Sequence, residues 1–182
     1  RKMSHDEVYV PKKNIVHPWE LDVDPANPAA GDYYVPEGPF EIHGGHHDAG
    51  DYDTRLTHLA IPEQFMSLYM SMPEKFYDGQ IFIPESNNGI PDILDEAAWN
   101  LMHYEYLQDY FAEVRGEYGA IPGGMESTTH PPKWPTQGAG DALKYFMRKA
   151  TPYTTFYGAA AFAQAARAFK DIDANASKRY LK

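Results

Sequence analysis

The sequence has no cysteine among its 182 residues, and its basic side chains are few. The missing cysteines exclude disulfide bonds and thiolate metal sites, but they say little about the cellular compartment. Sixteen Lys and Arg residues stand against 26 Asp and Glu, which gives a formal net charge of −10 and a pI of about 5.2. This balance argues against nucleic acids and anionic membrane surfaces as partners, because both repel a net anion. No apolar run approaches the roughly 18 residues that span a membrane.

Apolar and aromatic residues, in contrast, are plentiful. Hydrophobic residues make up 43% of the chain, enough for one soluble domain with a sizeable core. The 14 Tyr, 9 Phe and 3 Trp residues are a high aromatic content. Aromatic side chains usually belong to the core, but Tyr and Trp also form flat platforms for sugars.

The apolar spacing predicts a mainly helical, all-α chain with long loops. Residues 1–40 are rich in proline and are expected to be an irregular segment that wraps the rest or leads into it. Apolar residues recur every three or four positions in 56–70, with Pro62 marking a boundary, in 90–111 and in 151–169. In the last of these helices the residues predicted to share one face are Tyr153, Phe156, Tyr157, Ala160, Ala163 and Gln164.

The remaining segments complete this organisation. Residues 115–141 are rich in Gly and Pro and are expected to form a loop, and no strand pattern of any length is present. Residues 170–182 resemble the start of a further helix without a cap or stop signal. We therefore expect residues 41–182 to be the first part of a larger helical domain.

The motif HGGHHDAGDYD, at residues 43–53, concentrates histidines, aspartates and glycines. Asp48 and Asp51 lie three residues apart, so on a tight turn both carboxylates face one point, where they can hold a water and remove its proton. The alternative is a helix N-cap followed by a first-turn acid, a common structural arrangement. His43, His46, His47 and the two aspartates also suggest a transition-metal site. Their spacing, however, matches no established helical ligand pattern.

Three segments in order resemble glycoside hydrolase family 9, the endoglucanase and cellobiohydrolase family that cuts β-1,4-glucans. GGHHDAGDYD is similar to the family signature GG-x-x-DAGD-[YH], and DGQIFIPESNNGIPDILDEAAWNL is similar to the turn that leads into its second long helix. FAQAARAF is similar to its alanine-rich helix. The resemblance covers roughly residues 44 to 170 and implies the N-terminal part of an (α/α)6 barrel.

The resemblance also implies an inverting reaction carried out by two carboxyl groups. Asp51 corresponds to the base that activates water, and Asp48 to its partner in holding that water. The family's general acid is a glutamate far towards the C-terminus, so we expect it to lie beyond this sequence and residues 1–182 alone to be inactive. Glu85, Glu96 and Glu126 are nearer carboxyl groups, but none of them lies in a matching motif.

Substrate contacts are implied for four further residues. His47 and Tyr52 flank the DAGD motif, and His130 and Trp134 lie in a loop similar to one that brings a histidine and a tryptophan to the family's cleft. Trp134 has a second interpretation, as an anchor of its proline-rich loop. His46 and His47 depart from the family, which more often has an aromatic and a variable residue there.

Partners and localisation follow from the same resemblance. It implies a β-glucan polysaccharide or oligosaccharide as substrate, no nucleic acid or membrane partner, and a secreted or periplasmic protein. The family's structural zinc site uses cysteines and is excluded here, whereas its calcium ligands fall mostly beyond residue 182, so no cofactor is assigned. The alternative function is that of a non-catalytic carbohydrate-binding or structural protein on the same scaffold.

Overall fold

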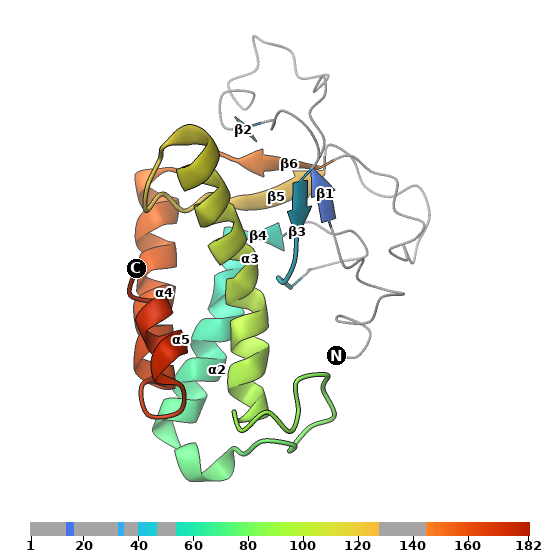
Figure 1. The fold of residues 1–182 in the computed structure, drawn as a ribbon, viewed down its shortest axis with the longest axis vertical. Coiled ribbons are helices and arrows are strands. Elements are labelled where there is room, and N and C mark those ends of the chain that lie inside the picture. The colour runs from blue at the N-terminus through green and yellow to red at the C-terminus, as the bar shows by residue number, and fades with distance from the viewer. Residues whose placement is uncertain (1–13, 17–32, 35–39, 47–53, 128–144) are drawn as a thin grey trace.

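α-Helices form the main body of the part of the protein that the structure describes (Figure 1). The computed structural model describes residues 14–16, 33–34, 40–46, 54–127 and 145–182. Within them the α-helices are α2 (Ala60–Ser71), α3 (Asp92–Arg115), α4 (Pro152–Phe169) and α5 (Ala174–Arg179), and the 3-10 helices are η2 (Leu56–Leu59) and η3 (Pro73–Lys75). The mainly helical prediction is confirmed, and the three predicted long helices are α2, α3 and α4.

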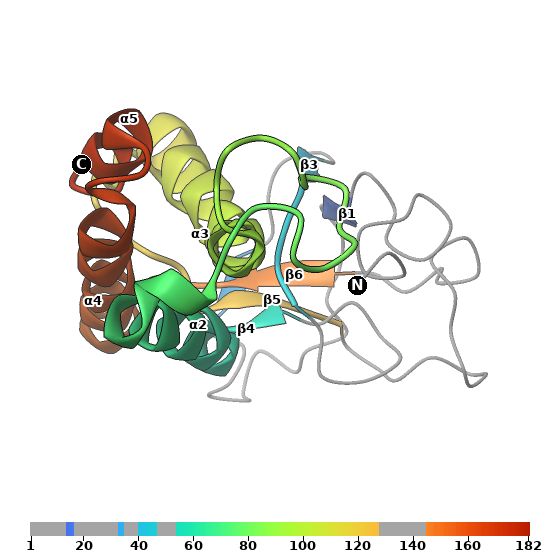
Figure 2. The same cartoon turned by 90° about the horizontal axis from the view of Figure 1, so that it is seen from below.

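Helices α2, α3 and α4 lie side by side, with α3 running in the opposite direction to the other two (Figures 1 and 2). The predicted apolar stripe of α3 faces this core. Its fully buried members are Leu94, Ala97, Leu101, Tyr104, Leu107 and Phe111. Met66 of α2 and Ala161 and Ala165 of α4 meet this stripe, so the small residues of α4 let the helices approach closely.

The ends of the helices follow from local sequence. Pro62 lies in the first turn of α2, where its missing N–H costs no hydrogen bond. Pro91 precedes the first residue of α3, and Gly116 ends that helix in the left-handed conformation, with φ of 68°. The hydroxyl of Thr151 accepts a hydrogen bond from the Thr154 amide and caps α4.

Two small antiparallel sheets flank the helices, and the sequence did not predict them. Strands β1 (Asn14–Val16) and β3 (Phe40–Ile42) pair with each other. A four-stranded sheet has the order β2 (Tyr33–Tyr34), β6 (Tyr145–Arg148), β5 (Gly124–Ser127), β4 (Thr54–Arg55). Each strand has two to four residues, which is too short for an alternating pattern to stand out. β5 therefore lies inside the predicted loop 115–141.

The packing of α4 and α5 differs from the prediction in two respects. On α4 the predicted face is largely exposed, with Tyr153 at 70% and Phe156 at 76%, whereas the opposite side is buried. The residues of that buried side are Thr154, Gly158, Ala161, Phe162, Ala165, Ala166, Ala168 and Phe169. On α5 a cap is present, because the Asp173 carboxylate accepts hydrogen bonds from the amides of Asn175 and Ala176 in the first turn.

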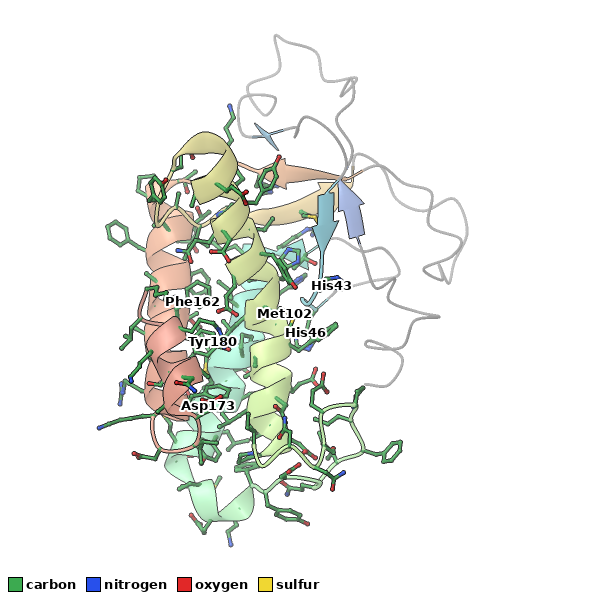
Figure 3. The ribbon with its side chains drawn as sticks, in the orientation of Figure 1. His43, His46, Met102, Phe162, Asp173 and Tyr180 are labelled. Atoms are coloured by element: carbon green, nitrogen blue, oxygen red, sulfur yellow. The ribbon has the colours of Figure 1, made fainter. Side chains whose placement is uncertain are left out.

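The ring of Tyr180 fixes the end of α5 against α4. It stacks on Phe162 with ring centroids 6.0 Å apart and contacts Phe169 at 5.6 Å (Figure 3). The buried Ser177 hydroxyl donates to the Ala166 carbonyl at 2.7 Å.

Among the described residues, no helix combines the length and the apolar character that a membrane crossing requires.

The loop that leads into α3 is held by two carboxylates. Asp78 accepts hydrogen bonds from the amides of Asn87, at 2.5 Å, and Gly89, at 2.6 Å. Asp92, at the start of α3, accepts from the amides of Gly79 and Ile81 at 2.9 and 2.7 Å. Asp92 thereby braces the start of α3 against the preceding loop.

Candidate active site

The structure describes the first four residues of the 43–53 motif and the two residues that follow it. Asp48, Asp51, His47 and Tyr52 lie outside the described residues, and so do His130 and Trp134 of the predicted cleft loop. Their proposed roles therefore stay predictions. The structure does describe the residues on either side of the two aspartates, 43–46 and 54–55.

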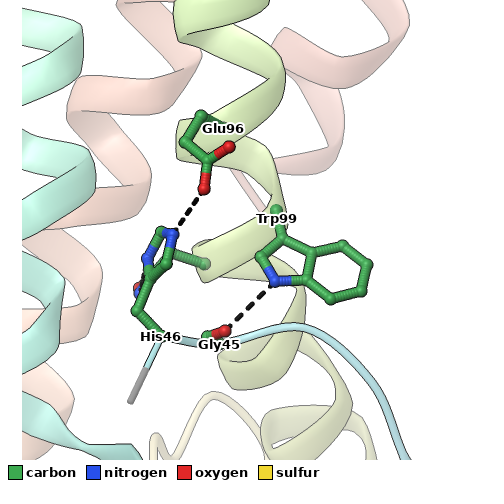
Figure 4. Close-up of polar contacts among 5 residues, drawn as sticks. Gly45, His46, Glu96 and Trp99 are labelled. Carbon is green, nitrogen blue, oxygen red and sulfur yellow. Dashed lines mark hydrogen bonds and ion pairs between the residues drawn. The ribbon is translucent and has the colours of Figure 1, made fainter. Parts of the chain in front are cut away.

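Gly44 and Gly45 lie directly against the middle of α3. Both adopt positive φ, 80° and 87°, which a glycine tolerates because it has no Cβ. The Gly45 amide donates to the Trp99 carbonyl at 3.0 Å, and the Trp99 indole N–H donates back to the Gly45 carbonyl at 3.1 Å (Figure 4). A Cβ on Gly44 would overlap the Trp99 carbonyl oxygen. The glycines of the motif thus serve a close approach of two backbones.

His46 is held on the same helix through both ring nitrogens. Its Nε2 lies 2.6 Å from Oε1 of Glu96, and its Nδ1 lies 2.7 Å from Nδ2 of Asn100 (Figure 4 shows the ring between the motif and α3). Glu96 and Asn100 are four residues apart, so they point from one side of α3. The imidazole orientation two residues before Asp48 is therefore fixed from both sides.

The chain that leaves the motif is anchored to the same helix. The Tyr104 hydroxyl donates to the Arg55 carbonyl at 2.5 Å. Thr54, which is fully buried, pairs with Met125 of β5, and the Leu56 amide donates to the Gly123 carbonyl at 3.0 Å. Burial of the Tyr104 side chain raises its pKa, so the phenol stays protonated and can act as the donor.

The two anchored ends lie next to each other. A Cβ placed on Gly45 would lie 3.0 Å from Cγ2 of Thr54 and 3.3 Å from Cβ of His103. The described residues that precede and follow Asp48 and Asp51 therefore meet at nearly the same place on α3. Anchoring of both flanks on a rigid helix is a suitable support for catalytic groups.

Part of this support was missed or misassigned by sequence reasoning. Glu96 lies one turn into α3, and its carboxylate binds His46, a contact that the sequence did not indicate. Asn100 and His103 were not singled out, although both are fully buried. The signal that could have found them is a polar stripe at positions 96, 100 and 103, at helical spacing beside the apolar stripe.

Aromatic residues of α3 divide between core and surface. Tyr104 lies in the core, whereas Tyr106 is 41% exposed, and its ring centroid lies 5.8 Å from that of His43. His43 and His46 are the described members of the histidine cluster (Figure 3). Across the described ranges no three His, Asp or Glu side chains come together as metal ligands.

Comparison with known proteins points to one group of enzymes. The chain is 31% identical over 144 residues to a cellulose 1,4-beta-cellobiosidase from Acetivibrio thermocellus, covering 73% of this chain and 16% of that protein. It is 39% identical over 66 residues to a xyloglucan-specific endo-beta-1,4-glucanase from Bacteroides ovatus, covering 36% of this chain and 11% of that protein. No family model matches the sequence.

A solved structure extends this similarity over most of the fold. A metagenome-derived glycoside hydrolase family 9 endoglucanase superposes with a TM-score of 0.67 at 30% identity, covering 95% of this chain and 28% of that one. The chain thus spans less than a third of the proteins that it matches.

Proposed function

Because the chain belongs to glycoside hydrolase family 9, we propose that the protein hydrolyses β-1,4-glucosidic bonds in cellulose or related β-glucans with inversion. Asp51 is the base that takes a proton from the attacking water, and Asp48 helps to hold that water. His47, Tyr52, His130 and Trp134 are the proposed sugar contacts. The names of the similar proteins support cellulose and xyloglucan as the substrates to test first.

The observation that carries this proposal is the anchoring of the chain on both sides of the two aspartates. Gly45 and His46 precede the pair and bind Trp99, Glu96 and Asn100 of α3. A general base has to stand within hydrogen-bond reach of its water in each turnover, and anchored flanking residues favour such a constant position.

An inverting mechanism also needs a general acid at a defined distance from the base. An inverting glycosidase separates its base and its acid by roughly 6.5–9.5 Å, so that a water fits between the base and the sugar. Glu85 and Glu96 are described, but Glu96 is committed to His46, and its side chain is only 13% exposed. We therefore leave the general acid unassigned within this sequence.

Replacement of Asp51 by Asn in the complete enzyme that carries this sequence tests the proposal. An amide takes up no proton from water, so release of reducing sugar from a soluble β-glucan is expected to fall about 10²–10⁴-fold while the fold is kept. Asp48→Asn is expected to have an equal or smaller effect. The first product formed should be the α-anomer by NMR, because inversion of a β bond gives α.

Three results would contradict the proposal. Near wild-type turnover by Asp51→Asn would remove this residue as the base, and a β-anomeric first product would remove inversion. A wild-type protein that binds β-glucan without releasing sugar would support the alternative, a non-catalytic carbohydrate-binding protein.

A further inference from the structure

His46 is locked in place more completely than the backbone contacts of the motif require. Gly45 already fixes the main chain against α3 through its two hydrogen bonds with Trp99. The His46 ring adds contacts at 2.6 Å to Glu96 and 2.7 Å to Asn100, and the side chains of His46 and Glu96 are only 14% and 13% exposed. These polar contacts are thus largely shielded from water. Hydrogen bonds are stronger in such a shielded environment than in water.

The partners also fix which nitrogen carries the proton. The Glu96 carboxylate accepts, so Nε2 of His46 is the donor, and the Asn100 amide nitrogen donates to Nδ1. A ring bound at both nitrogens has little rotational freedom. Any displacement of this ring moves the chain that continues from it.

We propose that His46, held by Glu96 and Asn100, is a positioning residue that sets the location of the Asp48 and Asp51 carboxylates. This inference rests on the proposed function. Asp48 follows His46 by two residues, so its Cα lies at most roughly 7 Å from that of His46. The clamp acts through the backbone and contacts neither water nor sugar in the reaction. Misplacement of a catalytic group by 1 Å can cost about 10²-fold in rate.

A purely structural clamp and a positioning clamp predict different kinetics. If the clamp only stabilised the fold, His46→Ala would lower the unfolding midpoint and leave kcat unchanged in the folded protein. If it positions the base, His46→Ala lowers kcat roughly 10–100-fold, with KM for a soluble β-glucan nearly unchanged.

The Glu96 side chain supplies a conservative rescue. Glu96→Ala removes the acceptor and is expected to match the loss in His46→Ala. Glu96→Gln keeps an oxygen that accepts from Nε2, so its kcat is expected to stay within about threefold of wild type. The double variant His46→Ala, Glu96→Ala is expected to be no slower than either single variant, because one contact is removed only once.

Glu105→Ala is the matched control on the same helix. Its carboxylate binds Nε of Arg179 at 2.8 Å, on a different segment from the described residues of the motif. This variant also loses an ion pair from α3, but its kcat is expected to equal that of the wild type. All variants are assayed in the protein that carries this sequence, at a temperature where each is folded by circular dichroism.

The possible failures are distinguishable. An active wild type with unchanged kcat in His46→Ala overturns the positioning role and leaves the proposed function standing. The same conclusion follows if Glu96→Gln is as slow as Glu96→Ala, or if the losses in the double variant multiply. A wild-type protein without glucanase activity overturns the proposed function, and with it this inference.

Discussion

Gly44 is the position where the smallest change is expected to have the largest effect. Its φ is 80°, and a Cβ built on it would overlap the Trp99 carbonyl oxygen, lie 2.9 Å from the His103 amide nitrogen and 3.0 Å from Cβ of Met102. Two of these three atoms belong to the backbone of α3, which cannot yield without losing helical hydrogen bonds. Gly44→Ala therefore has to displace the motif.

The expected loss of free energy of unfolding in Gly44→Ala has two contributions. A Cβ in the left-handed conformation costs about 1–2 kcal/mol. Overpacking against atoms that cannot move adds about 1–3 kcal/mol. The free energy of unfolding of Gly44→Ala is therefore expected to fall by about 2–5 kcal/mol, provided that the motif stays docked.

Gly89→Ala is a control that isolates the first contribution. Gly89 has a similar φ of 89°, but it is exposed, and a Cβ there would meet no atom within 4 Å. Denaturant unfolding of both variants should show a larger loss for Gly44→Ala by at least about 1 kcal/mol. If the motif detaches instead, hydrogen exchange of the Gly45 amide should accelerate, because that amide donates to Trp99. Equal unfolding energies with unchanged Gly45 exchange would refute the close-packing argument.

Two further predictions concern metals and pH. A strong chelator is expected to leave hydrolysis intact, because His46 already binds α3 through both nitrogens; zinc-reversible inactivation, with loss of activity in His47→Ala, would instead support a metal-dependent hydrolase. Burial raises the pKa of Glu105, although its hydrogen bond with Arg179 opposes the shift. Since the folded-state pKa lies above the unfolded value, the folded protein holds more protons in the window just above the ordinary glutamate pKa, and stability falls as pH rises through it. Glu105→Gln should flatten the dependence of Tm on pH in that window, and an unchanged slope would show that Glu105 is not the group responsible.

The fold class could be predicted because α3 and its neighbours carry strong local signals. Pro91 and Asp92 mark the start of α3, Gly116 marks its end, and the apolar spacing between them gives the buried stripe. Similarity to solved family 9 endoglucanases confirms that this is part of an (α/α)6 barrel. The resemblance of the motifs had indicated the same family.

Contacts between distant segments could not be predicted in this way. His46 and Glu96 are 50 residues apart, and neither residue carries a local sign of the other. The exposed side of α4 was misjudged for a related reason. Both sides of this helix carry aromatic residues and alanines, so its own sequence does not show which side is buried. Packing against α2 and α3 buries the side of Ala161 and Phe162.

Helix α3 carries two stripes with different partners, and this sets limits on how the gene can vary. Apolar side chains such as Leu94 and Leu101 face the helical core, whereas Glu96, Trp99 and Asn100 contact the motif. One residue inserted between Asp92 and Glu96 would rotate the side chains before the insertion by about 100° around the helix axis relative to those after it. The entry loop would then lose its anchor at Asp92, or the motif its anchor at Glu96. Insertions and deletions among related genes should therefore collect at the exposed positions of residues 72–90 and be absent from α3.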